Sequence, residues 1–95
     1  MTTLTYNSDN RIKTVDFTDD MIIVGLIDGR IISVPLIFYP RLFNASNEQR
    51  LNWQLCGGGY GIHWDEIDED LSAEGLLNGS PAPKKNYLSA IWQIL

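Results

Sequence analysis

Apolar and polar side chains alternate along the first part of the chain in the way that is typical of β-strands. The alternation over residues 11–18 predicts a half-buried strand with two different faces. One face carries Lys13, Val15 and Phe17, and the other carries Ile12, Thr14 and Asp16. A second run, residues 21–27, is apolar and β-branched, and it ends at Asp28-Gly29, a dipeptide that strongly favours a hairpin. Residues 30–34 are therefore expected to form the returning strand.

A two-residue turn at Asp28-Gly29 would pair Ile27 with Arg30 and Leu26 with Ile31. With this register both faces of the hairpin are apolar: Ile22, Val24, Leu26 and Ile31 on one, and Ile23, Ile27, Ile32 and Val34 on the other. Large exposed apolar surfaces usually mark an interaction site. We therefore expect helices on both sides of the sheet, or association through one face, including a homodimer.

Two short helices are predicted after the hairpin. Pro40 suits the first position of a helical turn. Ser46 and Gln49 have the spacing of a capping box, which predicts a helix over residues 47–55. The side chains of this helix that are expected to face the sheet are Leu51 and Leu55.

Glycines at positions 57, 58, 59 and 61 follow this predicted helix. They are expected to cap its C-terminus and reverse the chain into a strand over residues 60–64, because phosphate-binding glycine loops precede a helix instead. Ser72 has the properties of an N-cap for a third helix, which Gly79 would end. Leu76 and Leu77 of that helix are expected to pack on the sheet.

The elements together predict a small α+β domain, an antiparallel sheet of three to four strands centred on the hairpin, with short helices packed on it. Residues 1–10 are expected to be a flexible N-terminus, residues 11–79 the domain, and residues 80–95 a linker followed by a helix. Apolar residues recur at helical spacing in that last segment: Leu88, Ile91, Trp92 and Leu95. This helix is expected to pack on the free side of the hairpin or to bind a partner.

Composition narrows the class of function. The chain has 95 residues, which is enough for one domain. Its net charge is -5 and its seven basic residues are scattered, so we do not expect it to bind nucleic acid directly. Cys56 is the only cysteine, which excludes an intrachain disulfide and favours a reducing compartment, and we expect its side chain to be buried. No membrane span or leader pattern is visible, so we expect a cytoplasmic protein.

The candidate chemistry is concentrated at the only histidine, His63, and in the acidic run that follows it over residues 65–70. A metal site is not expected, because one histidine with a carboxylate run lacks the repeated ligand spacing of zinc sites and the pattern of a calcium loop. Paired catalytic carboxylates are not expected, since adjacent positions of an extended segment point apart. Neither a cofactor nor a Cys56–His63 nucleophile pair is indicated. A solvated acidic edge that meets a basic partner is favoured.

Several short motifs together resemble the DUF2442 family of small bacterial proteins. They are Val34-Pro35-Leu36, Tyr39-Pro40-Arg41-Leu42, Gly61-Ile62-His63-Trp64 and the block from Asp68 to Leu77. The resemblance runs from about Ile12 to Gly79 and implies a small α+β domain, which in some relatives precedes a helix-turn-helix. Other members lie beside DUF4160 proteins in what look like toxin–antitoxin pairs. This chain has Asp65 where many relatives have proline, and we expect no helix-turn-helix behind the domain.

The leading hypothesis is a non-enzymatic protein-interaction module, an antitoxin-like partner of a basic DUF4160-type toxin. The acidic run would attract the partner, and exposed aromatic side chains would anchor it. The residues expected to bind the partner are Tyr39, Arg41, Trp53, His63, Trp64, Asp65, Glu66, Asp68, Glu69 and Asp70. Two alternatives are a small metal-dependent or hydrolytic enzyme that uses His63 and nearby carboxylates, and an accessory subunit in transcriptional control.

Overall fold

The computed structural model describes residues 7–80, which form two antiparallel sheets of three strands each with three short α-helices. The first sheet, in the order β1-β2-β3, contains β1 (Ile12–Phe17), β2 (Met21–Leu26) and β3 (Ile31–Pro35). The second, in the order β4-β5-β6, contains β4 (Gln54–Cys56), β5 (Gly61–Trp64) and β6 (Glu69–Ser72). The helices are α1 (Pro40–Phe43), α2 (Asn47–Leu51) and α3 (Ala73–Asn78). The α+β class is thus confirmed, with a second sheet added to the predicted one.

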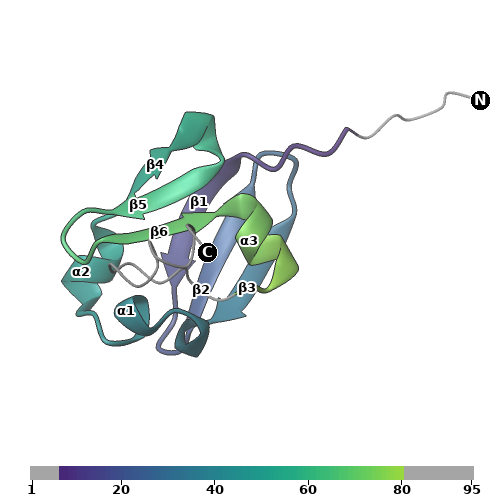
Figure 1. The fold of residues 1–95 in the computed structure, drawn as a ribbon. Helices are drawn as coiled ribbons and strands as arrows, with labels where there is room; N and C mark the ends of the chain where they lie inside the picture. Colours follow the sequence, from purple (N-terminus) through teal and green to yellow (C-terminus); the bar gives the residue numbers. More distant parts are fainter. Residues whose placement is uncertain (1–6, 81–95) are drawn as a thin grey trace, which may run out of the picture.

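The second sheet lies across the first, with α1 and α2 at one end and α3 beside β3 (Figure 1). Two short 3-10 helices, η1 (Leu36–Phe38) and η2 (Gly57–Gly59), complete the connections. Within residues 7–80 no helix has the length and apolar character needed to cross a membrane. The predicted C-terminal helix that carries Leu88, Ile91, Trp92 and Leu95 lies outside the described residues.

A bulge in β1 changes which side chains face the core. The pairing of β1 with β2 shifts between Ile12 and Thr14, so Lys13 is an extra residue in the strand. One extra residue reverses the alternation of faces along a strand. Ile12 and Val15 are both buried as a result, and Lys13 is exposed. The predicted face that joined Lys13 to Val15 and Phe17 is therefore wrong.

The turn between β2 and β3 has three residues rather than the predicted two. The backbone N–H of Leu26 donates to the carbonyl of Arg30 at 2.9 Å, so the predicted pair of Ile27 with Arg30 is wrong. Gly29 has a φ of 97°, as the last residue of a three-residue turn requires. The Asp28 carboxylate accepts from the Arg30 backbone N–H at 3.1 Å and from its guanidinium at 2.9 Å, which holds the longer turn.

This register gathers the apolar side chains on the inner face of the first sheet. They are Ile22, Val24, Leu26, Ile32 and Val34. Ile31 instead lies on the outer face, where its side chain is 71% exposed beside the exposed Ser33. The predicted grouping of Ile31 with Leu26 is therefore wrong, and the outer face is less apolar than expected. Association through this face remains a prediction.

The helix predicted over residues 47–55 ends at Leu51, and Gln54 to Cys56 form β4 instead. A short helix gains little from propensity alone, and the backbone of β4 finds hydrogen-bond partners in β5. Leu51 is 65% exposed and Leu55 is 40% exposed, so their predicted packing on the sheet is wrong. The three glycines of η2 link β4 to β5 with positive φ angles of 59°, 70° and 98°, and they do not cap a helix.

The predicted start signals of the three helices and the predicted stop signal of α3 are confirmed. Pro40 occupies the first turn of α1. Ser46 and Gln49 form the capping box of α2, with the Gln49 backbone N–H donating to the Ser46 hydroxyl at 3.1 Å. The Ser72 hydroxyl accepts from the third residue of α3 at 2.9 Å, and Gly79 ends that helix in the left-handed conformation.

The core lies between the two sheets and is closed by η1, α1 and α3. Its members are Ile12, Val15, Ile22, Val24, Leu26, Val34, Leu36, Tyr39, Leu42, Ile62, Trp64, Leu71, Ala73 and Leu76. Helix α3 contributes Ala73 and Leu76 to it, while Leu77 is 38% exposed. The predicted packing is therefore confirmed for Leu76 and wrong for Leu77.

Candidate functional site

His63 lies at the centre of the outer face of the second sheet. The antiparallel register places Gln54 of β4 on one side of it and Asp70 of β6 on the other. The His63 Nδ1 lies 2.6 Å from a carboxylate oxygen of Asp70, and its Nε2 lies 3.3 Å from a carboxylate oxygen of Asp65. Both ring nitrogens of His63 are therefore engaged by carboxylates.

These contacts change the acid–base behaviour of the histidine. The hydrogen bond with Asp70 and, to a smaller extent, that with Asp65 raise the pKa of His63 above its ordinary value of 6.5, while desolvation opposes them. An imidazolium at position 63 would be neutralised by one of its two carboxylate partners, so the compact cluster keeps a net negative charge. Among residues 7–80 no group of three or more His, Cys, Asp or Glu side chains has a geometry that could hold a metal ion.

The turn between β5 and β6, residues 65–68, presents carboxylates to solvent. Asp65 has a side chain that is 88% exposed, and Glu66 and Asp68 are exposed as well. The Glu66 carboxylate accepts from the Gln49 side chain of α2 at 3.2 Å, and the Asp68 carbonyl accepts from the Arg41 guanidinium of α1 at 3.2 Å. The turn is thus held at both helices, and we call Asp65, Glu66 and Asp68 the acidic turn.

Asp68 also carries a conformational signal. Its φ is 51°, in the left-handed region, and within residues 7–80 it is the one residue other than glycine with a positive φ. Aspartate and asparagine tolerate this region better than most residues. A non-glycine residue in this conformation, with its carbonyl hydrogen-bonded to Arg41, indicates a turn with one defined shape.

Glu69 does not belong to the exposed edge that the sequence predicted. Its side chain is fully buried at 0% exposure, and one of its oxygens accepts from the backbone N–H of Asp70 at 2.9 Å. Burial, and then the nearby charge of Glu69, raise the pKa of Tyr39. Glu69 was expected to contact a partner, but its position at the start of β6 turns it towards the core.

The aromatic side chains that were expected to anchor a partner differ in burial. Tyr39 is 1% exposed and Trp64 is 0% exposed, so their predicted exposure is wrong. Trp64 fills the space between the sheets, where it meets Phe17 edge to face and donates its indole N–H to the Arg50 carbonyl at 2.9 Å. Trp53 is half-buried against the core and remains partly accessible.

Cys56 is exposed, which contradicts its predicted burial. It lies on β4 opposite Gly61, and a Cβ atom added to Gly61 would lie 2.9 Å from the Cys56 sulfur. The thiol therefore covers a bare part of β5 on the outer face of the sheet. His63 lies two residues further along β5, and its Nδ1 is already paired with Asp70. Within residues 7–80 no hydrogen bond joins Cys56 to His63.

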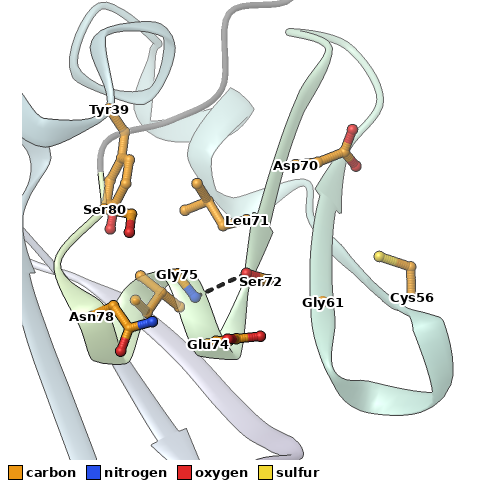
Figure 2. Close-up of a pocket in the computed structure, with 11 residues that line it drawn as sticks. Tyr39, Cys56, Gly61, Asp70, Leu71, Ser72, Glu74, Gly75, Asn78 and Ser80 are labelled. Atoms are coloured by element: carbon orange, nitrogen blue, oxygen red, sulfur yellow. Dashed lines mark hydrogen bonds between the residues drawn. The ribbon is translucent and has the colours of Figure 1, made fainter. Parts of the chain in front are cut away.

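A groove of about 630 Å³ lies between β6, α3 and the start of α1. Its apolar lining includes Tyr39, Leu71 and Leu76, and its carboxylates are Asp70 and Glu74. Figure 2 shows Tyr39 on one wall and the strands that carry Gly61 and Cys56 on the opposite wall, with the Ser72 cap of α3 between them. The groove joins the His63 cluster through Asp70, and we call it the β6 groove.

The sequence profile of the family described as "Protein of unknown function (DUF2442)" matches residues 12–82. The chain belongs to the DUF2442 family. The match agrees with the resemblance seen in the sequence and covers both sheets and all three helices of the described part. No curated protein matches this DUF2442 chain.

Two solved structures share the fold of this DUF2442 protein. A protein of unknown function from Rhodospirillum rubrum is 32% identical with a TM-score of 0.67, and the alignment covers 79% of this chain and 92% of that one. An uncharacterised protein from Chromobacterium violaceum, solved in solution, is 20% identical with a TM-score of 0.65, and the alignment covers 86% and 75% of the two chains. The second likeness shows the fold alone.

The structure of this DUF2442 chain shows contacts that the sequence did not predict. Gln49 was recognised only as a cap, yet its side-chain amide also holds Glu66. Arg50 accepts the hydrogen bond of Trp64 and donates to the carbonyls of Leu42 and Phe43, each at 2.9 Å. Each contact joins separate elements, so spacing along one element carried no signal for it.

Proposed function

We propose that this DUF2442 protein is a non-enzymatic protein-interaction module of the cytoplasm that binds a basic partner in the manner of an antitoxin. The observation that carries the proposal is the acidic turn, whose shape is held while its carboxylates face solvent. The Gln49 contact fixes Glu66, and the Arg41 contact fixes the backbone of Asp68. A preorganised charged turn loses little conformational entropy on binding.

The charge of the whole chain supports the same proposal. A net charge of -5 attracts basic proteins over distances of about the Debye length, roughly 8–10 Å at physiological salt. The engagement of both His63 nitrogens by Asp65 and Asp70 favours a contact surface over a site in which the imidazole would bind a metal or take up a substrate proton. The DUF4160 neighbours implied by the family resemblance provide the first candidate partner.

The proposal is tested by titrating the full chain with a purified DUF4160 protein in a calorimeter at low and at high salt. The variant Glu66→Gln/Asp68→Asn removes two charges of the acidic turn but keeps the acceptor for Gln49 and a residue suited to the left-handed region. We expect it to weaken binding about three- to tenfold at low salt, since exposed ion pairs contribute about 0.2–1 kcal/mol each, and to reduce the dependence on salt.

The matched control is Asp16→Asn/Asp19→Asn, which removes two exposed charges of β1 and the turn after it. This control changes the net charge by the same amount, so it should weaken binding much less than the acidic-turn variant. Equal losses in the two variants would show that only net charge matters. Binding that does not change with salt would contradict a basic partner altogether.

A further inference from the structure

The residues of the acidic turn are held in different ways, and one of them contacts a side chain that titrates near neutral pH. The Glu66 carboxylate accepts from the uncharged amide of Gln49, and Asp68 is held through its carbonyl rather than its carboxylate. Asp65 instead has a carboxylate oxygen 3.3 Å from Nε2 of His63. Protonation of His63 therefore changes the surroundings of Asp65 directly.

The two contacts of His63 are unequal. Its Nδ1 lies 2.6 Å from Asp70, whereas the contact of Nε2 with Asp65 is longer and the Asp65 side chain is 88% exposed. An imidazolium donates from both nitrogens, but a neutral imidazole has one N–H and one lone pair. The shorter contact keeps the remaining proton on Nδ1, so Nε2 then turns a lone pair towards a carboxylate. Deprotonation of His63 thus releases Asp65.

The charged groups that act on His63 come from the turn and from β6. Strand β4 places the uncharged Gln54 opposite His63, and the Cys56 thiol lies two residues further along that strand. Strand β6 places Asp70 on the other side, and the turn adds Asp65. The hydrogen bond with Asp70, and then that with Asp65, raise the pKa of His63, so its imidazolium persists at higher pH than that of a free histidine.

We propose that the protonated His63 competes with the basic partner for Asp65, and that a lysine or arginine of the partner displaces the imidazolium and releases its proton. This inference rests on the proposed function, because it requires a cation that binds the acidic turn. The cluster of His63, Asp65 and Asp70 carries one net negative charge when His63 is protonated and two when it is neutral. The affinity for a basic partner therefore rises as pH rises through the pKa of His63.

The test uses the full isotope-labelled chain and two probes, a purified DUF4160 protein and an N-acetylated pentalysine peptide. Lysine side chains do not titrate between about pH 5.5 and about pH 8, so the peptide adds no pH dependence of its own. Binding is followed by the NMR signals of the acidic turn. The pKa of His63 is measured from its imidazole signals with and without saturating probe, and the dispersion of the spectra checks that each variant is folded.

We expect the affinity for the peptide to rise about two- to fivefold over this pH range, the factor that one exposed ion pair contributes. The pKa of His63 should fall when either probe binds, as reciprocity requires. His63→Gln keeps a polar side chain that does not titrate, so its affinity should not change with pH. Asp65→Asn should show a smaller pH dependence, whereas the matched control Glu66→Gln should weaken binding and keep the pH dependence.

The possible results separate this inference from the proposed function. A pKa of His63 that does not change on binding, or the wild-type pH dependence in His63→Gln, would overturn the inference and leave the acidic turn as a binding surface. Binding of the peptide alone, with the expected pH dependence, would support the inference and contradict only the DUF4160 partner. If neither probe shifted the signals of the acidic turn at any pH, both proposals would be wrong.

Discussion

At the scale of single residues, the contacts of His63 with Asp70 and Asp65 make the stability of the folded state depend on pH. Asp70 is the largest cause of the raised pKa of His63, and Asp65 is the second. The folded state thus binds this proton more tightly than the unfolded state. The stabilisation is fully present below the unfolded pKa of about 6.5 and is lost as pH rises through the higher folded pKa.

We expect Asp70→Asn to lower the pKa of His63 towards 6.5, because an amide removes the charge that favours the imidazolium. The pKa is measured by an NMR titration of the imidazole protons, which is unambiguous since the chain has one histidine. Asp16→Asn, which is exposed on β1, should leave the pKa unchanged. A wild-type pKa at or below 6.5 would contradict the cluster.

The sequence predicted the helix caps correctly but predicted the burial of several side chains wrongly. The caps at Ser46 and Ser72 depend on groups three residues away, so spacing alone was sufficient. The burial of Tyr39 and Glu69 depends on which face of a short element the rest of the chain covers. Cys56 is exposed for the same reason, since β4 turns that side chain to the outer face. The preference of free cysteine for burial was overridden by its place on the sheet.

At the scale of elements, the two serine caps are expected to differ in their effect on stability. Helix α3 buries Ala73 and Leu76, whereas α2 buries none of its residues. Loss of a cap costs about 1 kcal/mol when the helix must form for the core to pack. We therefore expect Ser72→Ala to lower the free energy of unfolding by about 1 kcal/mol, and Ser46→Ala to lower it less because α2 can fray locally.

The measurement is urea unfolding of both variants, with Ser33→Ala on the outer face of β3 as the control. Ser33 is exposed, so its loss should change the free energy of unfolding by no more than about 0.5 kcal/mol. Hydrogen exchange should show faster opening of α2 in Ser46→Ala without a matching change elsewhere. Equal destabilisation by the two cap variants would show that α2 is as strongly coupled to the core as α3.

The boundaries of the elements were harder to predict than their existence. The Asp28-Gly29 turn was found from its sequence, but its loop has three residues, and the Asp28 carboxylate binds Arg30 at the end of it. The extra loop residue shifts the register and places Ile31 on the outer face. The end of α2 was also missed, because the helical spacing of Leu51 and Leu55 continues past Leu51, where pairing with β5 takes over.

At the scale of the whole molecule, the α+β class followed from the pattern, while the second sheet did not. Strand β5 was predicted, but β4 and β6 are only three and four residues long, too short for alternation to be distinguished from a turn. Strand β6 was missed because it begins inside the acidic run, where Glu69 and Asp70 were expected to be solvated side chains. The candidate site depends on this sheet, since β5 and β6 bring Asp70 to His63 across a separation of seven residues.

Trp64 connects the parts of the molecule, and its replacement tests how strongly they depend on one another. It lies in β5, meets Phe17 of β1 with ring centroids 6.5 Å apart, and donates to the Arg50 carbonyl of α2. Trp64→Phe keeps an aromatic ring but leaves that carbonyl without its donor, so we expect a loss of about 2 kcal/mol in the free energy of unfolding. Trp53→Phe, at a half-buried position, should cost about 1 kcal/mol or less. Both are measured by urea unfolding followed by circular dichroism, and a loss for Trp53→Phe as large as that for Trp64→Phe would contradict the central role of Trp64.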